Sequence, residues 1–133
     1  MSSEKINELA LKLLKMVKTT FRISRALCYL DQECKRIDET TFVTGGLEFK
    51  VSKELQQFAI DAIDRSFKEI REIAKRYGVS DVPISFIVMR VWSMLGYAFS
   101  PCTIYVLIKE YCEKHGIEIV FRKHFGEEFV LLK

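Results

Sequence analysis

Three side chains near the C-terminal end of the chain have the types and the spacing of metal ligands. Cys112 and His115 lie three residues apart, so both could face one ion on a helix, and His124 could supply a third ligand. Zinc sites of this kind usually contain a second closely spaced ligand pair. The other cysteines are too far apart in the sequence to form such a pair. We therefore expect no bound metal and no other cofactor.

The cysteines could also act as nucleophiles, but a catalytic thiol needs a base beside it. The sequence places neither Cys28 nor Cys102 near a histidine. All the cysteines lie among apolar neighbours in segments with helical periodicity, which favours reduced, buried thiols in a cytoplasmic protein. They are Cys28, Cys34, Cys102 and Cys112. The first residues also lack the apolar core of a secretory signal, which again favours a cytoplasmic location.

No glycine-rich loop has the position that phosphate binding requires. Such a loop lies between a strand and a helix, whereas Gly45 and Gly46 lie between two β-prone runs. We therefore expect that the protein is not an enzyme and has no small-molecule substrate.

Polar and basic side chains on two predicted helices could contact DNA. Base edges and phosphates are bound mainly by Arg, Lys, Asn, Gln, Ser and Thr, and neither helix is rich in these types. The candidates are Ser80, Ser85, Arg90, Thr103, Tyr105 and Lys109. The alternative is that both helices belong to the core and contact no ligand.

A third candidate surface is the basic face of an N-terminal helix. Apolar residues from Ile6 to Val17 recur at helical spacing behind a serine cap. The opposite face carries Lys5, Lys12, Lys15 and Lys18. Such a face is usually only solvated, and it becomes a nucleic-acid surface if dimerisation brings two copies together. A second helical stripe, out of phase with the first, runs from Ile23 to Ile37.

The net charge of the 133-residue chain is +3, and its distribution says more than its size. Residues 1–38 contain 8 basic and 5 acidic side chains, and the two signs balance in the rest of the chain. A non-specific nucleic-acid binder would have a larger surplus, because phosphate neutralisation supplies most of its affinity. Asn and Gln are scarce while Lys, Glu, Arg and Ile are abundant, which is typical of a thermophile.

The central part of the chain predicts a hairpin followed by a long helix. Two β-prone runs, residues 40–44 and 47–51, flank the glycine pair, which suits a two-residue turn. Ser52 then caps a helix with an unbroken apolar stripe from Leu55 to Tyr77, and Gly78 ends it.

Two further helices and a second hairpin are predicted after this helix. The helices cover residues 81–95 and 101–114, and the strands cover residues 117–122 and 128–132. The 18 uncharged residues 91–108 approach the length of a membrane span. A glycine at position 96 and a Ser-Pro pair at 100–101 predict a helix end and a helix start within this run. We therefore expect two buried helices that meet at a turn.

Residues 72–91 resemble a helix-turn-helix. In this family a small residue four positions before the turn glycine lets two helices cross closely, and Ala74 and Gly78 match this feature. Apolar residues six and nine positions after that glycine pack the second helix on the first, and Ile84 and Ile87 match these positions. The resemblance implies that the second helix of this pair would contact DNA.

Residues 95–133 are similar to the back half of a winged-helix domain. The similarity consists of a turn, then Ser100, Thr103 and Ile104 at the start of a helix, a helix end at Gly116, and a hairpin wing. It implies that residues 101–114 form the recognition helix. The two resemblances therefore compete over which helix contacts DNA.

We predict one α+β domain over residues 1–133, mainly helical, with five helices, two β-hairpins and a winged-helix-like C-terminal half. The N-terminal helices occupy residues 1–38, the first hairpin residues 39–51, and the helix-turn-helix and wing-like region residues 52–133. The predicted function is that of a small homodimeric transcriptional regulator that binds duplex DNA without catalysis. The alternative is a protein-interaction or assembly module in which the helix-turn-helix and the wing only pack the core.

Overall fold

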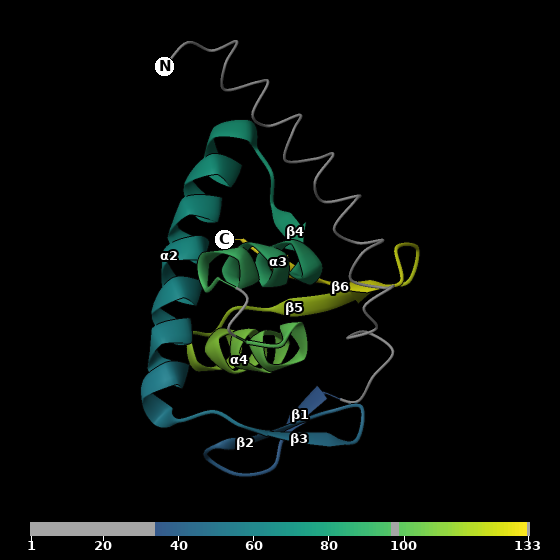
Figure 1. The fold of residues 1–133 in the computed structure, drawn as a ribbon. Coiled ribbons are helices and arrows are strands. Elements are labelled where there is room, and N and C mark those ends of the chain that lie inside the picture. Colours follow the sequence, from purple (N-terminus) through teal and green to yellow (C-terminus); the bar gives the residue numbers. More distant parts are fainter. Residues whose placement is uncertain (1–33, 97–98, 133) are drawn as a thin grey trace.

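A computed structural model describes residues 34–96 and 99–132 of the chain (Figure 1). Within these residues the fold is α+β, with three helices and two small antiparallel sheets of three strands each. The first predicted N-terminal helix, with the candidate residues Lys12, Lys15 and Lys18, and the second predicted helix up to residue 33 lie outside the described residues.

The first sheet, called sheet A here, confirms the predicted glycine hairpin. Its strands β1 (Cys34–Arg36), β2 (Thr41–Thr44) and β3 (Leu47–Lys50) pair in the order β1-β2-β3. Gly45 and Gly46 have φ angles of 55° and 88°. A two-residue turn of this type requires positive φ at both central residues, which glycine adopts without steric cost.

The helical stripe predicted up to Ile37 is wrong at its end, because Cys34–Arg36 is a strand. Cys34 pairs with Thr44 and Arg36 pairs with Phe42. One face of this sheet packs on a helix from the C-terminal half, so contacts distant in sequence override the local helical periodicity.

Helix α2 (Lys53–Tyr77) has both predicted ends. The Ser52 side chain accepts a hydrogen bond from the Leu55 N–H, and Gly78 ends the helix with a left-handed φ of 67°. The buried stripe of the helix includes Ala59, Ile63 and Phe67, all completely buried. On the solvent face, ion pairs join Asp64 to Lys68 and Glu72 to Arg76, as one-turn spacing predicts.

The helix predicted from residue 81 starts later than expected. Asp81–Pro83 forms strand β4, and helix α3 begins after Pro83 and covers Ile84–Met94. Strand β4 pairs with a strand near the C-terminus, with Val82 opposite Val130. The segment predicted as a helix-turn-helix therefore has a strand between its two helices, and Gly78 is not a close crossing point. A Cβ atom at Gly78 would meet no atom within 4 Å.

Helix α4 (Pro101–Lys114) and the terminal hairpin agree with the prediction. Ser100 caps α4 by accepting from the Thr103 N–H, and a proline occupies its first turn. Strands β5 (Ile119–Arg122) and β6 (Glu127–Leu131) form the hairpin and join β4 in a second sheet, sheet B, of order β4-β6-β5. Among the described residues, no helix combines the length and the apolar composition that crossing a membrane requires.

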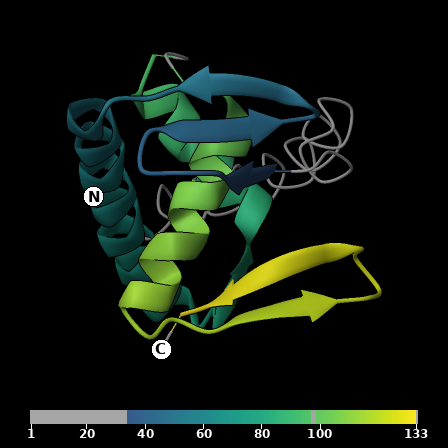
Figure 2. The same ribbon diagram turned by 90° about the horizontal axis from the view of Figure 1, so that it is seen from below.

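The core lies between the three helices (Figure 1). Helix α2 runs along one side of α3 and α4, sheet A lies beyond α4, and sheet B packs against α3. Figure 2, seen from below, shows β3 at the outer edge of sheet A. Fully buried side chains of the core include Ile84, Ile87, Val91, Ile104, Ile108 and Val130.

Candidate functional site

The side chains of two of the predicted DNA contacts, Ser85 and Thr103, are buried. Ser85 has no exposed surface, and Thr103 is 2% exposed. Ser85 lies in the first turn of α3, where its backbone N–H donates to Glu127, and the Thr103 N–H donates to Ser100. Both residues therefore stabilise helix starts inside the fold, and neither side chain is accessible to a ligand.

The other candidates lie nearer the surface, and three of them are bound to glutamates. Arg90 forms an ion pair with Glu69 that joins α3 to α2. The Tyr105 hydroxyl donates to Glu128, and Lys109 Nζ donates to the second oxygen of the same carboxylate at 3.0 Å. Burial raises the pKa of Tyr105, so its hydroxyl stays protonated. Ser80 is exposed, and its backbone oxygen accepts from the Leu132 N–H.

Sheet A covers one face of α4, the helix that the winged-helix similarity assigns to recognition. A disulfide joins Cys34 on β1 to Cys102 on α4, with their Cα atoms 5.4 Å apart. Beside it, Nε and Nη2 of Arg36 donate to the two carboxylate oxygens of Glu110, each at 2.7 Å. The prediction of reduced thiols is therefore wrong for these two cysteines, which are 68 residues apart and meet only through the fold.

The accessible strip of α4 borders an acidic pocket. This pocket of about 460 Å³ lies between α4 and the β5–β6 hairpin. Its lining includes Lys109 and four glutamates, which are Glu110, Glu113, Glu127 and Glu128. Phosphates are bound by positive groups and backbone N–H groups, and the one basic side chain of this lining, Lys109, is already paired with Glu128.

Glu127 is a buried carboxylate at the end of this pocket. It is 2% exposed, and it accepts from the Ser85 N–H at 2.8 Å. Helix α3 has no side-chain cap of its own at Pro83, so Glu127 acts as the cap from a distant strand, where a negative charge also suits the helix dipole. Burial raises the pKa of Glu127, and the hydrogen bond from the Ser85 N–H offsets this only in part.

The residues considered as metal ligands do not form a cluster. Among the described residues, no three His, Cys, Asp or Glu side chains are grouped as metal ligands would be. Cys112 is a buried free thiol whose pKa burial raises to about 11. The His115 ring packs on Tyr111 with their centroids 4.2 Å apart, and His124 lies at the β5–β6 turn beside Phe125.

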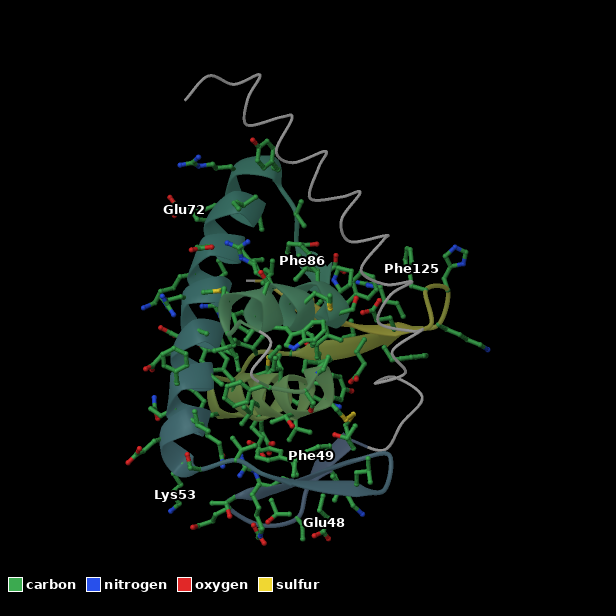
Figure 3. All side chains as sticks on the ribbon, in the orientation of Figure 1. Glu48, Phe49, Lys53, Glu72, Phe86 and Phe125 are labelled. Atoms are coloured by element: carbon green, nitrogen blue, oxygen red, sulfur yellow. A yellow bond between two sulfur atoms is a disulfide. The ribbon has the colours of Figure 1, made fainter. Side chains whose placement is uncertain are left out.

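Large apolar side chains are exposed along β3 and the start of α2. Leu47 is 66% exposed and Phe49 is 42% exposed. Phe49 also lines a groove of about 380 Å³ together with Val51, Leu55 and Phe99. Figure 3 shows Phe49 on the α4 side of sheet A and Glu48 on the opposite side. The sequence predicted this strand, but only the strand order reveals that no strand of the described residues pairs with its outer edge.

The pairing of β3 with β2 determines which backbone groups point outward. Val51 N–H donates to Thr40 at 2.7 Å, and the register places Phe49 opposite Phe42. Antiparallel pairs alternate between bonded and non-bonded, so residues 47, 49 and 51 point their N–H and C=O groups towards β2. The N–H and C=O groups of Glu48 and Lys50 therefore point away from the sheet, where no described strand pairs with them.

Comparison with known proteins gives no match: no family model fits the chain, and neither curated proteins nor solved structures show significant similarity to it.

Proposed function

We propose that the protein is a protein-interaction module whose contact surface is the open edge of sheet A. This surface, called the β3 edge surface, consists of the four residues of β3 and the groove beside it, which is lined by Val51, Leu55 and Phe99. One observation carries the proposal. Among the described residues, β3 is an edge strand with large apolar side chains in solvent.

An open edge strand is a template for another strand. Its unpaired N–H and C=O groups can extend the sheet, and alternate side chains then supply specificity. Proteins usually protect such edges with charges, prolines or bulges. Here Glu48 and Lys50 are the only charges of the strand, and they have opposite signs. The apolar residues Leu47 and Phe49 would gain about 25 cal/mol for each Å² that a partner covers.

Charge and geometry both favour this function over DNA binding in which α4 contacts the bases in a groove of the duplex. Residues 34–132 contain 14 basic and 14 acidic side chains, so this part of the chain has no surplus to neutralise phosphates. Sheet A covers one face of α4, and glutamates line the pocket beside its accessible strip.

Photo-crosslinking tests the proposal directly. A photoreactive residue replaces Leu47 in one sample and Lys123, at the β5–β6 turn, in a matched sample. Both are irradiated alone and in extract of the native cells. We expect discrete protein adducts from position 47 and none from position 123. The adducts should disappear when Lys50→Pro removes an outward N–H group, a change that an edge strand tolerates.

Binding to duplex DNA is the second candidate, and one observation favours it. Helix α3, a turn, α4 and the β5–β6 hairpin follow one another in the order that the winged-helix similarity predicts. In this arrangement Lys123 and His124 would lie at the tip of the wing, beside Arg122. Nucleic-acid adducts from position 123 without protein adducts from position 47, together with DNA affinity that falls as salt rises, would overturn the interaction module and favour this candidate.

A further inference from the structure

We propose that the partner of the β3 edge surface is a second copy of the same chain, paired antiparallel through β3 with Phe49 opposite Phe49. This inference rests on the proposed function and names its partner. The result is a closed two-fold dimer in which the two copies of sheet A form one continuous sheet.

The backbone supports this register. Glu48 and Lys50 carry the outward N–H and C=O groups of β3, so only these residues can bond to an added strand. With Phe49 on the two-fold axis, Glu48 of each copy lies opposite Lys50 of the other. Each such pair exchanges both of its hydrogen bonds, and all four outward groups of these two residues in each copy are satisfied.

The charges select the same register. Glu48 of one copy faces Lys50 of the other twice, and opposite charges placed directly across a sheet stabilise it. A shift by two residues in one direction places Glu48 opposite Glu48, and a shift in the other direction places Lys50 opposite Lys50. A shift by one residue would pair outward groups with residues that point towards β2. Among these registers, only the proposed one satisfies both the backbone and the charges.

The apolar side chains complete the interface. Phe49 meets its own copy in a non-bonded pair, where side chains approach most closely. Leu47 lies opposite Val51 of the second copy, and Val51 lines the groove. Leu47, which is 66% exposed in the single chain, therefore enters the groove of the partner molecule. The face that holds these residues is the one that packs on α4, so they extend the core of each copy.

A charge-reversal series tests the dimer. The wild-type chain should run at twice its mass of 15.5 kDa in size-exclusion chromatography with light scattering. Glu48→Lys and Lys50→Glu should each halve the measured mass, because each sets like charges against one another. Their equimolar mixture should return to the dimer mass, and so should the double variant. Glu72→Lys is the matched control, because Glu72 lies at the far end of α2 from β3 and the mass should not change (Figure 3).

Cysteine crosslinking tests the register. Phe49→Cys should form an intermolecular disulfide in mild oxidant, because directly opposed non-bonded residues have Cα atoms about 4.5 Å apart, within disulfide range. Glu48→Cys should crosslink at least tenfold more slowly, because its two copies are out of register. Equal crosslinking of the two variants would overturn the proposed pairing.

The failures of this inference and of the proposed function can be told apart. A monomeric wild type, or a dimer that neither charge reversal weakens, would overturn the pairing of two copies. If position 47 then still gives a discrete adduct with another protein that Lys50→Pro abolishes, the interaction module stands with a different partner. If position 47 gives no adduct at all, both proposals are wrong.

Discussion

At the scale of single residues, Glu127 is a buried carboxylate that also caps a helix. Its carboxylate caps α3 through the Ser85 N–H, yet burial disfavours its charge and raises its pKa. The folded protein therefore binds a proton at this site more tightly than the unfolded chain, whose glutamates titrate near pH 4.3. By linkage, the site stabilises the fold when it is protonated, and this advantage is lost as pH rises from about 4 through the folded pKa.

Replacement of Glu127 by glutamine should remove this pH dependence. The amide oxygen of Glu127→Gln can still accept from the Ser85 N–H, and it carries no charge. We expect the variant to gain stability relative to wild type as pH rises from 4 to 7, as measured by urea unfolding at each pH. Glu118→Gln, at an exposed position, is the control and should follow the wild type. Parallel pH curves for wild type and Glu127→Gln would show that Glu127 does not titrate differently on folding.

At the scale of elements, the end of α2 depends on backbone conformation rather than on packing. Gly78 has a φ of 67°, and a Cβ atom there would meet no neighbour within 4 Å. The requirement for glycine therefore comes from the left-handed conformation alone. One turn earlier, Ala74 is 4% exposed and belongs to the packed core, so a larger side chain at that position would have to displace its neighbours.

Substitutions at Gly78 should separate conformation from packing. Gly78→Ala should lower the free energy of unfolding by about 1 to 2 kcal/mol, because an L-residue is strained in the left-handed region. Gly78→Asn should lose clearly less, because asparagine tolerates this region better. Denaturant unfolding measures both, with the exposed Val79→Ala as control, expected within about 0.5 kcal/mol of wild type. An equal loss for Ala and Asn would contradict the conformational explanation.

At the scale of the whole molecule, the disulfide between Cys34 and Cys102 ties sheet A to the helical core. It closes a loop over a separation of 68 residues, and Arg36 adds two hydrogen bonds to Glu110 beside it. Disulfides are rare in the cytosol of mesophiles and common inside hyperthermophiles. The cytoplasmic location and the heat-adapted source stay predictions from the sequence.

Loss of the disulfide should destabilise the whole fold. In the chain-entropy model a loop of this length contributes about 4 kcal/mol, so Cys34→Ala with Cys102→Ala should lower the free energy of unfolding by about 2 to 4 kcal/mol. Urea unfolding with and without a dithiol reductant measures the effect. The reductant should lower the midpoint of the wild type and leave that of the double variant unchanged. A wild-type midpoint that the reductant does not move would show that the crosslink does not stabilise the fold.

The sequence by itself determined the elements whose signals are local. Ser52 and Gly78 mark the ends of α2, the glycine pair marks the first hairpin, and Ser100 marks the start of α4. Caps and tight turns involve residues only a few positions apart, so their physical causes are visible in a short stretch of sequence.

Only the tertiary structure decided the features that depend on distant partners. β1 and β4 are strands because β2 and β6 pair with them, although their local sequences predicted helix. The Cys34–Cys102 bond, the burial of Ser85 and the open edge of β3 also depend on which elements become neighbours. Burial and strand pairing are properties of the assembled chain, because they depend on residues far apart in sequence. The site that we propose is therefore the edge of sheet A and not the predicted DNA-contact helices.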